Sequence, residues 1–280
     1  MRYAISTAPQ RTDWNWLLET WLAADEIELF ESGWTFDHFY PLFGDSTEAC
    51  FEGWISLTAL LAETKRLRGG VLVTGILYRH PGLLANMAST LDHTSGGRLE
   101  LGVGAGWNEE ECLAYGIELG TMDERFDRFE EALKVIDSLL TNDRTNFAGA
   151  HYNFTDAMNN PKPLQRPLPI CIGGGGLKRT IPAAAKYAHH WNYGTQTMSV
   201  EDFKMRKRVF DQACETEGRD PADITISTLI RVADNTPAAL SDAVDSARAY
   251  EAAGVDLGIV SIPKHLPPDA LADIAGALTA

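Results

Sequence analysis

The stretch LELGVGAGWN, residues 99–108, decides the fold of this 280-residue chain. Its apolar residues Leu99, Leu101 and Val103 alternate, which predicts a β-strand. The strand runs into glycines at 102, 104 and 106, and the acidic residues 109–111 then predict the start of a helix. α/β folds place their ligand sites where a strand ends and a helix begins. We therefore expect a ligand to approach the backbone closely here, because glycine has no Cβ.

A second strand-to-helix junction of the same kind follows further along the chain. Its four consecutive glycines come after an apolar strand and are Gly173, Gly174, Gly175 and Gly176. Free backbone N–H groups ahead of a helix N-terminus favour phosphate. Lys178 and Arg179 oppose the helix dipole in the expected first turn, which also indicates a bound anion. The alternative is a tight turn without a ligand.

Alternating strands and helices without a break in composition predict one domain over residues 1–280, an α/β fold of the (β/α)8 TIM-barrel class. An open doubly wound sheet is the alternative. The expected strands are 3–6, 29–35, 71–74, 99–103, 168–172, 190–193, 224–231 and 257–261. Residues 141–167 read as an irregular insertion loop, which we expect to cover the site with His151 and Tyr152.

The amino-acid composition limits the classes of molecule that the chain is expected to bind. The chain has 24 basic and 39 acidic residues, a net charge of −15, which disfavours nucleic acid and anionic membranes and leaves a small-molecule substrate. No apolar run is long enough for a membrane span. The four cysteines have no metal-like spacing, which predicts reduced thiols and a cytoplasmic location.

Asp37 and His38 directly follow the second expected strand and are the main candidates for chemistry. Histidine can act as acid, base or hydrogen-bond donor near neutral pH, and Asp37 is expected to orient it or to bind a ligand hydroxyl. An inert surface pair is the alternative. Thr74 offers a hydroxyl at the end of the third strand, and His80 is expected to begin a helix. The run Glu109–Glu111 reads as a favourable first helical turn rather than an acid/base pair.

The chain resembles the luciferase-like monooxygenase superfamily of (β/α)8 enzymes. The resemblance rests on FDHF (36–39), TGILYRHP (74–81), LDHTSGGRLELGVGAGWNEEE (91–111), ERFDRFEEALKVI (124–136), PKPLQRPLPICIGGGG (161–176) and AHHWN (188–192). Within the superfamily, the pattern is most similar to the oxidoreductases that use the deazaflavin F420, and FMN-dependent monooxygenases that use O2 are the alternative.

The resemblance implies a role for each matching position. His38 falls at the catalytic histidine and Asp37 at a cofactor contact, while Val71 and Leu72 match a strand that carries a non-prolyl cis peptide behind the ring. The other implied contacts with the cofactor are Thr74, Gly104, Ala105, Gly106, Trp107 and Asn108 along the ring and its side chain, and Gly173, Gly174, Gly175, Gly176 and Lys178 at the phosphate.

One position departs from the family pattern. F420-dependent sugar-phosphate dehydrogenases carry a proton-donating glutamate where this chain has Trp107, which argues against that activity. The resemblance still implies hydride transfer between F420 and a small organic substrate, no metal, and a homodimer. Two further classes stay open on the residues alone, a metal-dependent or cofactor-free barrel lyase and a non-catalytic cofactor-binding protein.

Overall fold

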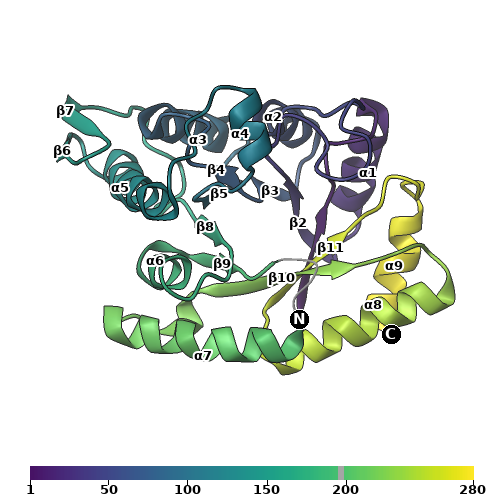
Figure 1. Ribbon diagram of the computed structural model, residues 1–280. Helices are drawn as coiled ribbons and strands as arrows, with labels where there is room; N and C mark the ends of the chain where they lie inside the picture. The colour runs from purple at the N-terminus through teal and green to yellow at the C-terminus, as the bar shows by residue number, and fades with distance from the viewer. Residues whose placement is uncertain (195–198) are drawn as a thin grey trace.

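The computed structural model describes residues 1–194 and 199–280, and its parallel strands close into a barrel (Figure 1). Seven barrel positions hold one strand each, and the eighth is shared by β3 and β4. The strands are β1 (Arg2–Ser6), β2 (Phe30–Thr35), β3 (Arg68–Val71), β4 (Thr74–Gly75), β5 (Leu99–Gly104), β8 (Ile170–Gly173), β9 (His190–Asn192), β10 (Thr225–Arg231) and β11 (Leu257–Ser261). Pairing of β3 with β5 closes the ring, so the open sheet is excluded and the predicted (β/α)8 barrel is confirmed.

Helices follow the strands and cover the outside of the barrel (Figure 1). They are α1 (Trp14–Glu26), α2 (Gly53–Glu63), α3 (Pro81–Thr94), α5 (Met122–Thr141), α6 (Thr180–Tyr187), α7 (Val200–Glu217), α8 (Pro237–Ala252) and α9 (Ala270–Thr279). A short extra helix, α4 (Glu109–Ala114), precedes α5. His80 caps α3 by accepting a hydrogen bond from the N–H of Gly82 at 3.2 Å, as expected for the residue before Pro81.

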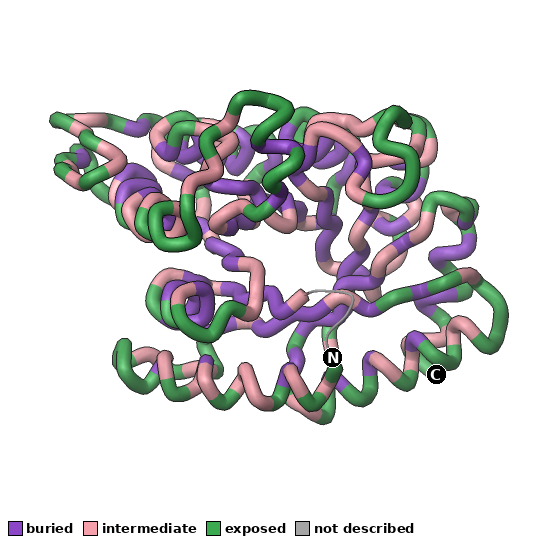
Figure 2. Tube along the Cα trace, in the orientation of Figure 1, coloured by how far each residue is buried: buried purple, intermediate pink, exposed green. Residues whose placement is uncertain are grey.

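Two apolar clusters build the core. The larger lies between strands and helices, and a smaller one inside the barrel contains Trp34 and Ile259. Figure 2 shows the resulting pattern, with buried segments along the strands and exposed segments on the outer faces of the helices. Because the strands are parallel, their C-terminal ends meet at one end of the barrel, which is where TIM barrels place their sites.

The expected irregular loop is wrong in part, because residues 141–167 contain the antiparallel hairpin β6 (Thr145–Ala148) and β7 (Asn153–Ala157). One carboxylate organises its turn: Glu131 accepts hydrogen bonds from the N–H groups of Ala150, His151 and Tyr152 at 2.7, 2.9 and 3.0 Å. The hairpin projects beyond α5 (Figure 1). His151 and Tyr152 therefore border a separate hollow beside Leu77 and Arg128, and they do not cover the candidate site.

In the described ranges, no helix combines the length and apolar character that crossing a membrane requires. The same residues contain no cluster of histidine, cysteine and acidic side chains suited to a metal ion.

Candidate active site

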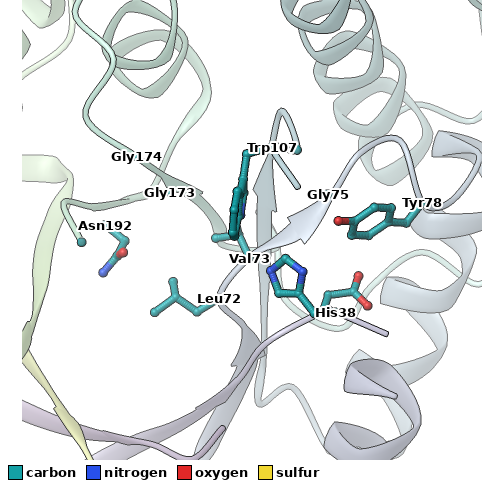
Figure 3. Close-up of a pocket in the computed structure, with 12 residues that line it drawn as sticks. His38, Leu72, Val73, Gly75, Tyr78, Trp107, Gly173, Gly174 and Asn192 are labelled. Carbon is teal, nitrogen blue, oxygen red and sulfur yellow. The ribbon is translucent and has the colours of Figure 1, made fainter. Parts of the chain in front are cut away.

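A cavity of about 240 Å³ opens at the C-terminal ends of the barrel strands (Figure 3). It brings together seven of the predicted residues: Asp37, His38, Leu72, Gly106, Trp107, Gly173 and Gly174. Five further lining residues lie outside the set assigned to the site: Val73, Gly75, Tyr78, Asn192 and Gly194. These segments are distant in sequence, so the site exists only because the barrel closes.

His38 is held by Glu111, a residue that sequence reasoning missed as a functional group. The His38 Nδ1 lies 2.7 Å from the Glu111 carboxylate, which also accepts hydrogen bonds from the Phe39 N–H at 2.5 Å and the Tyr78 hydroxyl at 2.8 Å. Glu111 is fully buried. The Glu111 carboxylate accepts hydrogen bonds, so the Nδ1 of His38 carries the proton that points to it. Nε2 is then the ring nitrogen available for a ligand.

Glu111 was expected to belong to a merely favourable first helical turn. It does lie in the first turn of α4. The three acidic residues of this turn differ in burial, however, because Glu109 and Glu110 are exposed, whereas Glu111 is buried and faces His38. A carboxylate three residues after the cap Asn108 returns toward the strand end, and this spacing is the signal that could have identified it.

Asp37 does not orient His38. Its carboxylate pairs with Arg79, with the Asp37 Oδ1 at 3.1 Å from the Arg79 Nη2 and a second bond at 2.5 Å from Nη1. Burial raises the pKa of Asp37 and outweighs the opposing effect of Arg79. Thr74 is also withdrawn from the cavity, because it is fully buried and its hydroxyl accepts a hydrogen bond from the Trp54 indole at 2.7 Å.

The cavity has a broad apolar wall. The Trp107 side chain, 61% exposed, stands near Val73 and Leu72 with His38 beside it (Figure 3). The Trp107 and His38 rings meet edge-on, with centroids 5.6 Å apart. A non-prolyl cis peptide does lie in this segment, between Leu72 and Val73, whereas Val71 is buried in the core instead of lining the cavity.

Three residues implied along the ring serve the scaffold. A Cβ at Gly104 would lie 2.7 Å from the Val73 Cγ2, so this glycine gives Val73 its space. Ala105 packs against the core, and the Asn108 side chain caps α4 by accepting a hydrogen bond from the Glu111 N–H at 3.2 Å. Gly104, Ala105 and Asn108 therefore support the cavity but do not line it.

The phosphate site expected at the glycines 173–176 does not use the cations that were predicted for it, Lys178 and Arg179. Gly175, Gly176 and Lys178 do not line the cavity, and α6 begins only at Thr180. Arg179 is engaged by Asp127 and Glu130 at 2.7 and 2.8 Å.

Another cation lies at the glycines: the Arg206 guanidinium of α7 donates to the carbonyl of Gly175 and pairs with Asp202 at 2.7 Å. None of the described residues accepts a hydrogen bond from the N–H of Gly175 or Gly176. These two backbone donors at the junction therefore lack an acceptor among the described residues.

The model of the luciferase-like monooxygenase family matches residues 4–258. The chain belongs to this family. The expected family is thus confirmed over most of the sequence. A family relative, the F420-dependent glucose-6-phosphate dehydrogenase of Amycolatopsis mediterranei, is 32% identical over 217 residues, which cover 77% of this chain and 62% of the relative. The chain therefore spans about three-fifths of that relative's length.

Other family members differ in their named cofactor. The FMNH2-dependent dimethylsulfone monooxygenase of Pseudomonas putida is 36% identical over 148 residues, 52% of this chain and 39% of the relative. Among solved structures, an F420-dependent secondary alcohol dehydrogenase in complex with an F420-acetone adduct superposes with a TM-score of 0.85 at 19% identity, covering 99% of both chains. That likeness confirms the fold.

Proposed function

We propose that this protein is an F420-dependent oxidoreductase acting on a small organic substrate. The observation that carries the proposal is the His38–Glu111 pair, which sits beside an apolar wall of Trp107, Leu72 and Val73 in a single cavity. This arrangement offers one face for a flat ring system and one titratable nitrogen at its edge. Family relatives named for F420 support the choice of cofactor.

The residues present fit such a cofactor. Gly173 and Gly174 form a wall without side chains, and a Cβ at Gly173 would lie 2.8 Å from the Val73 Cγ1 and displace it. The ring would be held by Trp107, Leu72, Val73 and Gly106, with Asp37 at the cavity edge. The free N–H groups of Gly175 and Gly176 would receive the phosphate, with Arg206 and Lys178 as the nearby cations. When bound, the deazaflavin exchanges a hydride with the substrate, whereas the protein supplies orientation and electrostatics.

His38 would move the proton. Because Glu111 occupies Nδ1, the proton given to or taken from the substrate passes through Nε2. Tyr78 keeps its own proton, since burial first and then the hydrogen bond to Glu111 raise its pKa. Trp107 replaces the glutamate expected in sugar-phosphate dehydrogenases, so the substrate of that relative is not part of the proposal.

Titration of the purified protein with F420 and with FMN tests the proposal. We expect saturable F420 binding, followed by deazaflavin oxidation or reduction with a panel of alcohols and carbonyl compounds. His38→Ala should retain F420 binding and lose turnover. Tight FMN binding without F420 binding would instead favour the FMN-dependent monooxygenase, which the Pseudomonas putida relative represents. We also predict a homodimer, which light scattering measures.

A further inference from the structure

A second hollow of about 360 Å³ opens at the same end of the barrel and has a different character. It lies at the ends of β1, β10 and β11, whereas the cavity takes its lining from the remaining five barrel positions. Four basic side chains line it: Arg11, Arg231, Lys264 and His265. No carboxylate is among its lining residues. In a chain with a net charge of −15, four basic side chains on the wall of one hollow are a local concentration of positive groups.

One of these basic groups, Arg231, is unpaired among the described residues. Arg11 is bound by Glu48, with Nε at 2.9 Å, and Lys264 lies 3.9 Å from the same carboxylate. Arg231 has no hydrogen-bond or ion-pair partner among the residues that the structure describes, whereas His265 interacts electrostatically with Asp234. Arg231 therefore keeps an uncompensated positive charge on the wall of the hollow, and an anionic group is the ligand that this charge attracts.

The walls of the hollow are fixed before any ligand arrives. The Arg11 N–H donates to the Ala49 carbonyl at 2.7 Å, and the Gln10 side chain accepts from the Leu42 N–H at 2.6 Å. The Trp16 indole donates to the Leu266 carbonyl at 2.8 Å, which sets an aromatic surface on one side. Preorganised walls reduce the entropy that binding must overcome.

The segment that fixes these walls also reaches the active site. Gln10 pairs with Cys50 in an isolated β-bridge, and the Cys50 thiol donates to the His38 carbonyl at 3.5 Å. The strands that carry the two hollows are also neighbours, with β1 beside β2 and β10 beside β9. The two hollows therefore lie over neighbouring strands at the same end of the barrel.

We propose that this second hollow binds a carboxylate or phosphate group at the end of the substrate remote from the reacting carbon. The proposal rests on the proposed function, because it takes His38 as the place of reaction. Arg231 and Lys264 would hold the anion by charge-assisted hydrogen bonds, with His265 at the rim. The substrate class is then a small organic anion in which the oxidised or reduced carbon is separated from the acidic group.

Calorimetric titration of the full-length protein with inorganic phosphate and with succinate tests this site without requiring turnover. We expect at least one anion to bind, and the variant carrying Arg231→Gln and Lys264→Gln to bind it at least about tenfold more weakly. Arg208→Gln is the matched control, because Arg208 is an exposed arginine on α7 outside both hollows and should leave the affinity unchanged. Phosphate retained by the double variant reports the glycine run at 173–176 instead.

The outcomes separate this site from the proposed function. Equal anion binding by wild type and double variant, or no binding of either anion by wild type, would overturn the second site. Loss of anion binding in the double variant together with absent F420 binding in wild type would leave the site standing and reject the deazaflavin assignment. Preference for phosphate or for succinate identifies the acidic group.

Discussion

At the scale of single residues, Glu111 fixes the direction in which His38 presents its proton. We predict that Glu111→Gln lowers turnover by about 10²-fold or more, because an amide nitrogen opposite Nδ1 favours the other tautomer. F420 affinity should change little. Steady-state kinetics with a pH profile, next to fluorescence titration of F420, separates the two effects. Glu109→Gln is the control, since Glu109 is exposed in the same helical turn; an equal loss in that variant would contradict the role of Glu111.

Arg79 holds the buried carboxylate of Asp37. Removing it in Arg79→Gln leaves Asp37 without its charge partner, so we expect a loss of about 3–5 kcal/mol in the free energy of unfolding. Urea denaturation measures it. The exposed Arg144–Asp156 pair provides the comparison, and Arg144→Gln should have little effect. Similar stabilities for the two variants would show that Arg79 does not hold Asp37 in place.

Some site residues could be predicted from sequence and others could not, for physical reasons. His38 and Trp107 come shortly after the ends of β2 and β5, and Gly173 is the last residue of β8, so the chain order already places them at the barrel mouth. Thr74 also lies at a strand end, in β4, yet its side chain contacts Trp54, and alternation cannot tell which face is lined. Tyr78 and Glu111 enter the site through loop and helix geometry, which depends on packing between distant segments.

At the scale of secondary-structure elements, a buried ion pair connects β5 with β9. The His190 Nδ1 lies 3.1 Å from the Glu100 carboxylate, and its Nε2 lies 2.6 Å from the Ser227 hydroxyl of β10. Burial lowers the pKa of His190, but Cys171 and Glu100 outweigh it and raise the value to about 10. Burial raises the pKa of Glu100, but His190 and Arg68 lower it to about 2.

These shifts define a pH window for stability. The raised pKa of His190 gives stability that is complete below about pH 6.5 and is lost as the pH rises through 10. The lowered pKa of Glu100 gives stability that is present above about pH 4.5 and is lost as the pH falls toward 2. Urea midpoints of wild type and His190→Gln should differ most between pH 5 and 6 and converge above pH 10. A constant difference would contradict the assignment.

The strand break between β3 and β4 explains why nearby glycines are required. We predict that Gly173→Ala weakens F420 binding by about tenfold or more, because its Cβ would push Val73 toward the cavity. Gly276→Ala in α9 is the control: its Cβ meets nothing within 4 Å, so the variant should be stabilised by about 0.5–1 kcal/mol and bind F420 normally. Wild-type affinity in Gly173→Ala would contradict the close packing.

Sequence periodicity located most barrel elements, because most strands are apolar. The strand expected at 71–74 is instead β3 at 68–71, whose sequence RGGV has one apolar side chain, followed by the short β4. β11 has the expected bounds, 257–261, and β10 ends at residue 231 as expected. The β6–β7 hairpin was missed because its strands are short and hold few apolar side chains, Phe147 and Phe154 among them, so no alternating pattern stands out. The Glu131 carboxylate holds its turn through backbone N–H groups, which sequence periodicity does not report.

At the scale of the whole molecule, the cavity draws its residues from five barrel positions, so it cannot outlast the closed barrel. We predict that F420 at 100 times its dissociation constant stabilises the fold by about 2.7 kcal/mol. Calorimetry should then show a single, raised melting temperature, and cofactor release should coincide with loss of far-ultraviolet circular dichroism. Release well below the melting transition would indicate that the site opens locally.

The exposure of Trp107 affects the fluorescence of the protein. Of the seven tryptophans, it is the one whose side chain stands largely in solvent, whereas Trp21, Trp34 and Trp191 are fully buried. Its indole should emit at longer wavelength than the buried ones, and any flat chromophore that enters the cavity must come within contact of it. The protein thus carries an intrinsic optical probe at the mouth of its own barrel.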